Sequence, residues 1–389
     1  MKEIYLDNSA TTALCDAAKD AIRGAMECYG NPSSLHPVGQ AARTLVENAR
    51  KEIAATLGVR GVLAPGQLIF TSCGSEADNI AILGTAYAKD RRRGGRIVTT
   101  DSEHPGVESA MRALEKDGFE VIRIPTRGGT LDFEAYETAL AKNPFLVSIM
   151  TVNNETGAMY DIKRAFAMAK AKNPDIVTHT DAVQGYLKMR LSPTAIDADL
   201  VTLSAHKIHA PKGAGALYVS PMALKRRDIV PTLLGGGQEG GFRSGTENVL
   251  GIAAFGAAAK EGYATLGRDL PYLCELRDYA EARLLTLPVR MHVPTGMRAP
   301  HILNFALPDI KSETMVHELS KSGICVSGGS ACSTHSKSLS RALLAFGVPE
   351  REVECSIRVS LCRYNTKEDI DALIEAMERA FAHLVKIHR

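Results

Sequence analysis

The stretch GQLIFTSCGSEADNIAILGTAYAKD, residues 66–90, contains an apolar run, a small polar turn and a helical pattern, in that order. The run LIFT favours a buried strand because it is short, apolar and bounded by a turn. Ser75 is a residue type that caps helices, and apolar side chains at helical spacing follow it. We therefore predict a strand, a tight turn and a helix that Ser75 caps.

The same alternation continues along the chain. Further strand patterns begin near residues 96, 120, 145, 175 and 198, and helical patterns lie between them at 105–118, 133–143 and 162–173. Strands that alternate with helices predict an α/β fold with a mostly parallel sheet covered on both faces. Beyond residue 260 the chain changes to an α+β pattern, with expected helices at 251–267 and 271–287 near the junction. We predict a large domain over residues 13–260 and a smaller domain made of residues 1–12 and 261–389.

Composition excludes several classes of protein. The chain has 389 residues, 45% of them hydrophobic, and a net charge of +2, so it can bury a large core and carries no strong field for nucleic acid or an acidic membrane. From the sequence we expect neither a signal peptide nor a segment that crosses a bilayer, since no apolar run is long enough. Eight cysteines without CxxC pairs predict reduced thiols in a cytoplasmic protein, with neither a disulfide scaffold nor a metal site.

Polar residues follow the ends of five predicted strands. In open α/β sheets, side chains at the carboxyl ends of strands face the ligand crevice. Each group alone is consistent with an ordinary loop, but five together indicate a single site. The groups are 72–76, Glu103 with His104, 153–155, Asp181 with Gln184, and Ser204 with His206 and Lys207.

Lys207 lies in VTLSAHKIHAPKGAGALYV, residues 201–219, at a tight bend between two apolar runs. A desolvated lysine has a lowered pKa and can form a Schiff base with an aldehyde, such as the cofactor pyridoxal phosphate (PLP). PLP also needs a carboxylate at its ring nitrogen, which Asp181 can supply, and a phosphate cradle, which Gly74 and Ser75 can supply at a helix start. Each residue also has an ordinary alternative: a surface turn for Lys207, a turn or cap for Asp181, and a plain N-cap for CGSE.

Ordered motifs along almost the whole chain resemble those of a known family. They are YLDNSATT, GNPSS, FTSCGSEADN, SEHPGV, VNNETG, HTDAVQ, SAHKIHAPKG, GGGQEGGFRSGTENV, SGGSACST and IRVSLCRYNTKEDID. The chain resembles the cysteine desulfurases of the NifS/IscS type, in the class V aminotransferase group of fold-type I PLP enzymes. Cys73 departs from the family, which commonly has glycine there, and suggests an altered phosphate turn.

The resemblance implies a role for each matching residue. Lys207 would join the cofactor and move the substrate's Cα proton, His104 would stack on the ring and assist proton transfer, and Asp181 would pair with the ring nitrogen. A homodimer is implied because one phosphate contact comes from a neighbouring subunit. The remaining implied cofactor contacts are Asn154 and Gln184 to the phenolic oxygen, Gly74, Ser75, Ser204 and His206 to the phosphate, and Thr246 to the neighbour's phosphate.

The substrate end of the site is implied in the same way. Arg358 would clamp the carboxylate of L-cysteine, with Asn31 helping. Cys332 lies among small and hydroxyl residues in SGGSACSTHSKS, which indicates a mobile, exposed loop in the smaller domain. Its thiolate would take the substrate sulfur as a persulfide, leaving alanine, and pass it to an acceptor such as an Fe–S scaffold. By the same resemblance Cys332 would ligate an Fe–S cluster transiently, while no resident metal is expected.

Two alternatives stay open at this point. Another class V PLP enzyme, such as a selenocysteine lyase or a small-amino-acid aminotransferase, would share the cofactor site; an aminotransferase would need no loop thiol. A sulfur-carrier or regulatory binding protein would keep the fold without catalysis, and the presence of both Lys207 and Asp181 argues against it.

Overall fold

The computed structural model describes residues 3–328 and 339–384, and its larger sheet has seven strands. The strands run across the sheet in the order β2, β8, β7, β6, β5, β3, β4, and all neighbours are parallel except β8, which is antiparallel to β2 and β7. This confirms the predicted mostly parallel α/β sheet. The strands are β2 (Leu68–Thr71), β3 (Arg96–Thr100), β4 (Glu120–Ile124), β5 (Leu146–Ser148), β6 (Val177–Asp181), β7 (Leu200–Ser204) and β8 (Gly215–Val219).

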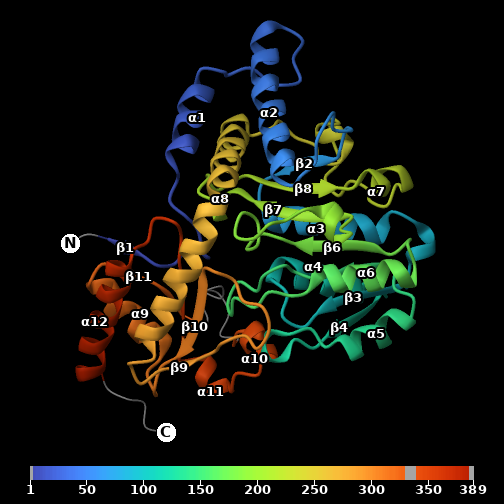
Figure 1. Ribbon diagram of the computed structural model, residues 1–389. Helices are drawn as coiled ribbons and strands as arrows, with labels where there is room; N and C mark the ends of the chain where they lie inside the picture. Colours follow the sequence, from blue (N-terminus) through green and yellow to red (C-terminus); the bar gives the residue numbers. More distant parts are fainter. Residues whose placement is uncertain (1–2, 329–338, 385–389) are drawn as a thin grey trace.

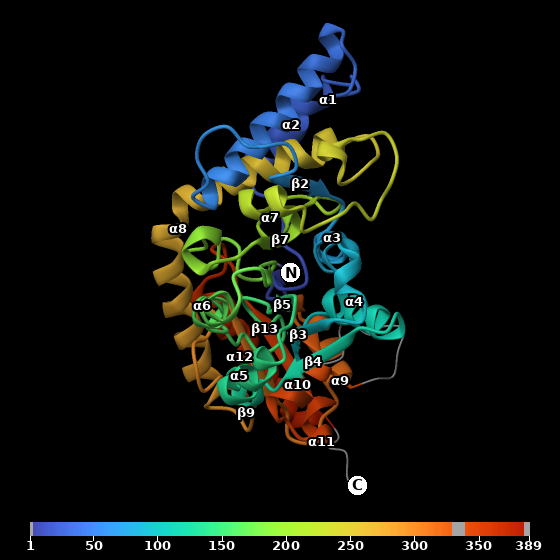
Figure 2. The same ribbon diagram turned by 90° about the vertical axis from the view of Figure 1, so that its right-hand side faces the viewer.

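Helices cover both faces of this sheet because successive strand residues point to opposite sides. Ile97 and Leu200 pack in one hydrophobic cluster with α3 and α4, whereas their neighbours Val98 and Val201 pack in another with α2, α5, α6 and α8. Figure 2 shows α1 and α2 beside α8 at one end of the molecule. The helices are α1 (Asp16–Met26), α2 (Pro37–Thr56), α3 (Gly74–Tyr87), α4 (Pro105–Lys116), α5 (Phe133–Ala141), α6 (Ile162–Lys172), α7 (Pro221–Arg226) and α8 (Val249–Leu284), with 3₁₀ turns η1 (Asp90–Arg92), η2 (Arg127–Gly129), η3 (Pro193–Ile196), η4 (Ala205–Lys207) and η5 (Glu239–Gly241).

A second core lies in the C-terminal part of the chain (Figure 1). Its antiparallel sheet has the strand order β12, β13, β10, β9, and β1 pairs in parallel with β11 beside it. The first residues therefore lie against the C-terminal part, while the domain limits given above stay a prediction. The elements are β1 (Ile4–Tyr5), β9 (Arg290–Met291), β10 (Ile302–Ala306), α9 (Ser312–Lys321), β11 (Ile324–Cys325), β12 (Ser327–Gly328), α10 (Arg341–Phe346), α11 (Glu350–Val353), β13 (Ser356–Ser360) and α12 (Lys367–His383).

Helix α8 is continuous where the sequence suggested two helices, and it passes through the predicted junction at residue 260. Pro271 lies inside it, although proline removes one hydrogen bond and crowds the carbonyl four residues earlier, at a cost of about 3 kcal/mol. That earlier residue is Gly267, where an added Cβ would meet nothing within 4 Å. Buried side chains on both sides, including Leu266 and Leu273, keep the helix packed through the proline. Tertiary packing thus outweighs the local helix-breaking signal.

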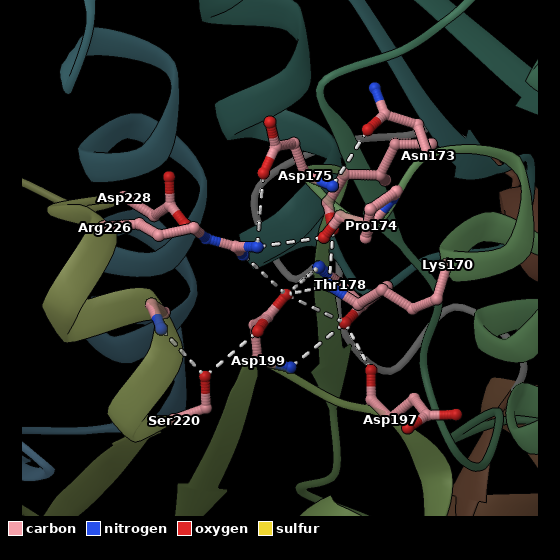
Figure 3. Close-up of polar contacts among 12 residues, drawn as sticks. Lys170, Asn173, Pro174, Asp175, Thr178, Asp197, Asp199, Ser220, Arg226 and Asp228 are labelled. Carbon is pink, nitrogen blue, oxygen red and sulfur yellow. Dashed lines mark hydrogen bonds and ion pairs between the residues drawn. The ribbon is translucent and has the colours of Figure 1, made fainter.

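A polar network closes the end of the sheet where β6 and β7 begin (Figure 3). Asp199, directly before β7, accepts hydrogen bonds from the Thr178 backbone N–H at 3.1 Å and the Ser220 hydroxyl at 3.0 Å. It also forms an ion pair with Lys170 of α6, and Arg226 of α7 lies 3.7 Å away. These contacts tie two helices to the amino ends of the central strands. The carboxyl ends of the same strands are left to form the site. Within the described ranges, we find no helix whose length and apolar character would suit a membrane crossing.

Candidate active site

A cleft of about 460 Å³ lies at the carboxyl ends of β6 and β7. Asp181 ends β6, Ser204 ends β7, and Lys207 ends the short turn η4 that follows. The start of α3, the residue before α4 and the N-terminal segment complete the walls, together with Arg358 of β13. Ten of the predicted residues line this cleft: Gly74, Ser75, His104, Asn154, Asp181, Gln184, Ser204, His206, Lys207 and Arg358.

The Lys207 amine points to the N-terminal segment. Its Nζ donates hydrogen bonds to the backbone carbonyls of Ser9 at 2.5 Å and Ala10 at 2.8 Å. The backbone carbonyl of Lys207 accepts from the buried Lys188 Nζ at 3.2 Å. The turn is held further by Thr12, whose backbone N–H and hydroxyl both donate to the carbonyl of residue 206. The amine is therefore held at one wall of the cleft by a fixed turn.

Asp181 is buried and His104 is half-buried in the cleft. Asp181 accepts a hydrogen bond from the Val183 backbone N–H at 2.9 Å. Burial raises the pKa of Asp181, against the attraction of His104 and Lys207. Burial lowers the pKa of His104, so its ring is neutral near pH 7. Because His104 Nδ1 accepts from the Gly106 backbone N–H at 3.1 Å, the ring hydrogen is on Nε2. Pro105 occupies the first position of α4, where its missing N–H removes no hydrogen bond from the helix.

The start of α3 and the end of β7 form an anion cradle. Backbone N–H groups of the first helical turn lack partners within the helix, and they attract anions. Gly74 lets the chain approach closely, because a Cβ there would lie 2.8 Å from Val183 Cγ2. The Ser204 hydroxyl is buried with no hydrogen-bond partner among the described residues. The sequence was wrong about the cap: α3 begins at Gly74, and Cys73 is the N-cap residue.

Cys73 does not distort this turn. Its φ of −169° is extended backbone that any residue adopts, so the expected need for glycine is absent. His206 completes the wall, where its Nδ1 contacts the Thr11 hydroxyl at 3.2 Å. Burial lowers the pKa of His206 to about 4, so the neutral ring contributes hydrogen bonds and no charge to this wall.

Arg358 marks the other end of the cleft. Its Nη1 donates to the Asn154 carbonyl at 2.9 Å, and its Nη2 donates to Asp7 at 2.7 Å and to the Ser327 hydroxyl at 3.1 Å. Its Nε is buried without a partner among the described residues. Gln184, another residue of the cleft lining, is fixed by a hydrogen bond from its Nε2 to the Ser9 carbonyl at 2.9 Å. The Arg358 contacts use three of the five N–H donors of the guanidinium, so this cleft-lining cation can still donate to a carboxylate.

Other predicted residues do not line this cleft. Asn31 is exposed before α2, with its side-chain oxygen accepting from the Ser33 backbone N–H at 2.9 Å, and Thr246 is exposed in the loop before α8. Cys332 lies outside the described residues. Asp7 and Asp78 also line the cleft and were not among the residues predicted to do so. Asp7 lies in the YLDNSATT motif, and Asp78 comes one helical turn after Ser75, so both carried a usable signal.

The residues present fit a pyridoxal cofactor. A buried acid, a fixed lysine amine, a helix start and an orphaned hydroxyl line one cleft, as its ring nitrogen, aldehyde and phosphate require. These features define an α/β enzyme of the PLP-dependent transferase class.

Comparisons with known proteins narrow this class. Residues 4–373 match the family described as Aminotransferase class-V. A cysteine desulfurase of Trichormus azollae is 40% identical over 97% of this chain and 92% of its own length, and the cysteine desulfurase IscS of Dictyoglomus turgidum is 38% identical over 98% and 95%. A solved NifS-like protein superposes with a TM-score of 0.90 at 34% identity, covering 98% of this chain and all of its own. The chain belongs to the class-V aminotransferase family, within its group of cysteine desulfurases.

Proposed function

We propose that the protein is a PLP-dependent cysteine desulfurase that converts L-cysteine into L-alanine and takes the sulfur as a persulfide on Cys332. The observation that carries the proposal is the meeting of Lys207, Asp181 and the α3 cradle in one cleft. The similarity to proteins named cysteine desulfurases over nearly the whole chain supports this reaction above a selenocysteine lyase or an aminotransferase.

Each wall of the cleft would hold one part of PLP. Lys207 would hold the aldehyde carbon, and Asp181 the ring nitrogen. Asn154 and Gln184 would bond the phenolic oxygen. Gly74, Ser75, Ser204 and His206 would hold the phosphate. When bound, PLP supplies an electron-withdrawing ring that makes the Cα proton of an amino acid easier to remove.

The chain's own residues would then position the substrate and move its proton. Arg358, which lines the cleft, would bind the carboxylate of L-cysteine and so fix the amino acid at one end of the cleft. The Lys207 amine, when released, would take the Cα proton and later return one. His104, neutral and half-buried, would use its Nε2–H to assist that transfer.

The sulfur step balances without an added oxidant. The Cβ–S bond of L-cysteine breaks as an S–S bond forms on Cys332, and a proton completes the methyl group of alanine. The persulfide would pass to a sulfur-acceptor protein such as an Fe–S scaffold. We further propose a homodimer in which Thr246, exposed before α8, contacts the phosphate of a neighbouring subunit, and that Asn31 assists Arg358 with the substrate carboxylate. The cysteines of the described ranges are free thiols, which supports a reducing, cytoplasmic setting.

One experiment tests the proposal. L-Cysteine is added to purified protein with PLP, and alanine and sulfide are measured in the wild type, Cys332→Ser and a control, Cys325→Ser, whose thiol is on β11. We expect alanine formation in the wild type and in the Cys325 variant, and its loss in the Cys332 variant. Unimpaired alanine formation in Cys332→Ser would contradict the persulfide step. A protein that never acquires visible absorbance with PLP would contradict the cofactor assignment.

A further inference from the structure

Asp78 is a second buried aspartate in the cleft. It lies on α3, one turn after Ser75, and is 1% exposed. One ligand atom from each of Asp78, His104 and Asp181 lies within 4.8 Å of the others. The Asp78 Oδ1 has no hydrogen-bond partner among the described residues. Two carboxyl groups this close inside a protein do not both ionise readily, so one of them must hold a proton.

The neighbouring groups decide which aspartate holds it. Asp181 has the Lys207 ammonium as an attracting cation and accepts a backbone N–H, whereas the neutral His104 ring brings no charge to either aspartate. Asp78 has no lysine or arginine ion pair in the described ranges, and its nearest basic group is His179 Nε2 at 3.7 Å. Burial lowers the pKa of His179 to about 3, so this ring is neutral.

The remaining groups around Asp78 add no positive charge. Thr202 of β7 has its hydroxyl 3.0 Å from His179 Nε2. Glu103, before α4, and Cys73, at the start of α3, can carry only negative charge. Burial, together with the charge of Asp181, raises the pKa of Asp78 well above its usual range. These two effects outweigh the Thr202 hydroxyl, which lowers that pKa.

We propose that Asp78 holds a proton in the folded protein and is a positioning residue for Asp181, which it leaves as the ionised carboxylate at the ring end of the cleft. The role of Asp181 toward the ring rests on the proposed function, whereas the protonation of Asp78 does not. The neutral carboxyl fills the space beside Asp181 with a polar group that brings no second negative charge. It thereby excludes water from the far side of that carboxylate.

The first test uses protein without cofactor. Infrared spectra of protein carrying ¹³C-labelled aspartate are recorded at pH 7 for the wild type and for Asp78→Asn. We expect the difference spectrum to lose one protonated carboxylic-acid band and no carboxylate band. Glu76→Gln, with ¹³C-labelled glutamate, is the control on the same helix: Glu76 is ion-paired with Arg243 at 2.7 Å and should lose a carboxylate band. Loss of a carboxylate band in Asp78→Asn overturns the proposal, whether or not the protein binds PLP.

The second test asks whether Asp78 acts on Asp181. The visible absorbance of PLP-loaded protein is titrated with pH in the wild type, Asp78→Asn and Asp78→Ala. Asparagine is neutral and has nearly the shape of a protonated aspartate. The pH midpoint of the absorbance titration in Asp78→Asn should therefore lie within about threefold in proton concentration of the wild-type midpoint. A midpoint shift of tenfold or more, as removal of a nearby negative charge would give, overturns the proposal.

Asp78→Ala opens the site beside Asp181 to water, which weakens the hold of that carboxylate on the protonated ring. We expect the midpoint of the absorbance titration in Asp78→Ala to move to lower pH, by more than threefold in proton concentration. A midpoint equal to the wild type in Asp78→Ala would show that the side chain does not position Asp181. Because Asp78→Asn is nearly isosteric, it keeps the proposal testable even where the alanine variant does not fold.

Discussion

Arg358→Lys should weaken binding of amino acids through their carboxylate. Nη1 and Nη2 of Arg358 already hold the Asn154 carbonyl, Asp7 and Ser327, which leaves two of its five N–H donors for the ligand. Lysine keeps the charge but cannot satisfy these partners and a carboxylate at once, because it lacks the planar fork. Loss of one charged hydrogen bond costs about 1.5–3 kcal/mol, which corresponds to roughly a 10- to 150-fold rise in the dissociation constant.

The assay compares two ligands that differ only in the group Arg358 should bind. Dissociation constants of L-alanine and L-alaninamide are measured from the absorbance of the PLP-loaded protein. The substitution should raise the dissociation constant of L-alanine by roughly 10- to 150-fold and change that of L-alaninamide by less than about threefold. An equal loss for both ligands would mean that Arg358 shapes the cleft without binding the carboxylate. Thermal unfolding of both proteins controls for the contacts that Arg358 makes with Asp7 and Ser327.

Two further predictions concern stability. Burial lowers the pKa of Lys188 to about 8, so between pH 8 and about 10.5 the folded protein binds fewer protons than the unfolded chain and its stability rises with pH, by about 3 kcal/mol in total. Lys188→Met should lack this rise in guanidinium unfolding at pH 7.5 and 10, and an equal rise in both proteins would refute the reasoning. Asp228 is 1% exposed and is paired with Arg92 and Arg226 at 2.6 Å each. Asp228→Asn should therefore lower the free energy of unfolding by about 3 kcal/mol. Asp175→Asn, an exposed partner of Arg226 at 3.6 Å, is the control and should cost less than about 1 kcal/mol; similar losses in the two variants would count against the burial argument.

The sheet could be predicted because its signal is local. Each core strand is a short apolar run, and in β3 the neighbours Ile97 and Val98 pack on opposite faces. Helix α8 could not be predicted in the same way. Pro271 is a strong breaker when only neighbours in sequence are considered, and the packing that overrides it comes from residues far along the chain.

Some residues of the site follow from local sequence patterns, and others are revealed only by tertiary packing. Lys207 and Asp181 were found because each follows the end of a recognisable strand. Asp78 lies inside a helix, where polar residues are usually solvated, and only the packing of α3 on the sheet reveals its burial. Asp7 meets Arg358 across 351 positions of sequence, a contact that no local pattern specifies.

The cleft exists only when distant segments of the chain come together. The Ser9 carbonyl accepts from both the Lys207 amine and the Gln184 side chain, and Thr12 holds the lysine turn from the same segment. Arg358 of the second sheet closes the far end. A ligand that spans these walls binds the folded protein and has no equivalent site on the unfolded chain, so its binding stabilises the fold. Because the N-terminal segment contacts Lys207 directly, changes at residues 9–12 should weaken PLP retention, if Lys207 holds PLP as proposed, before they disturb the distant network around Asp199.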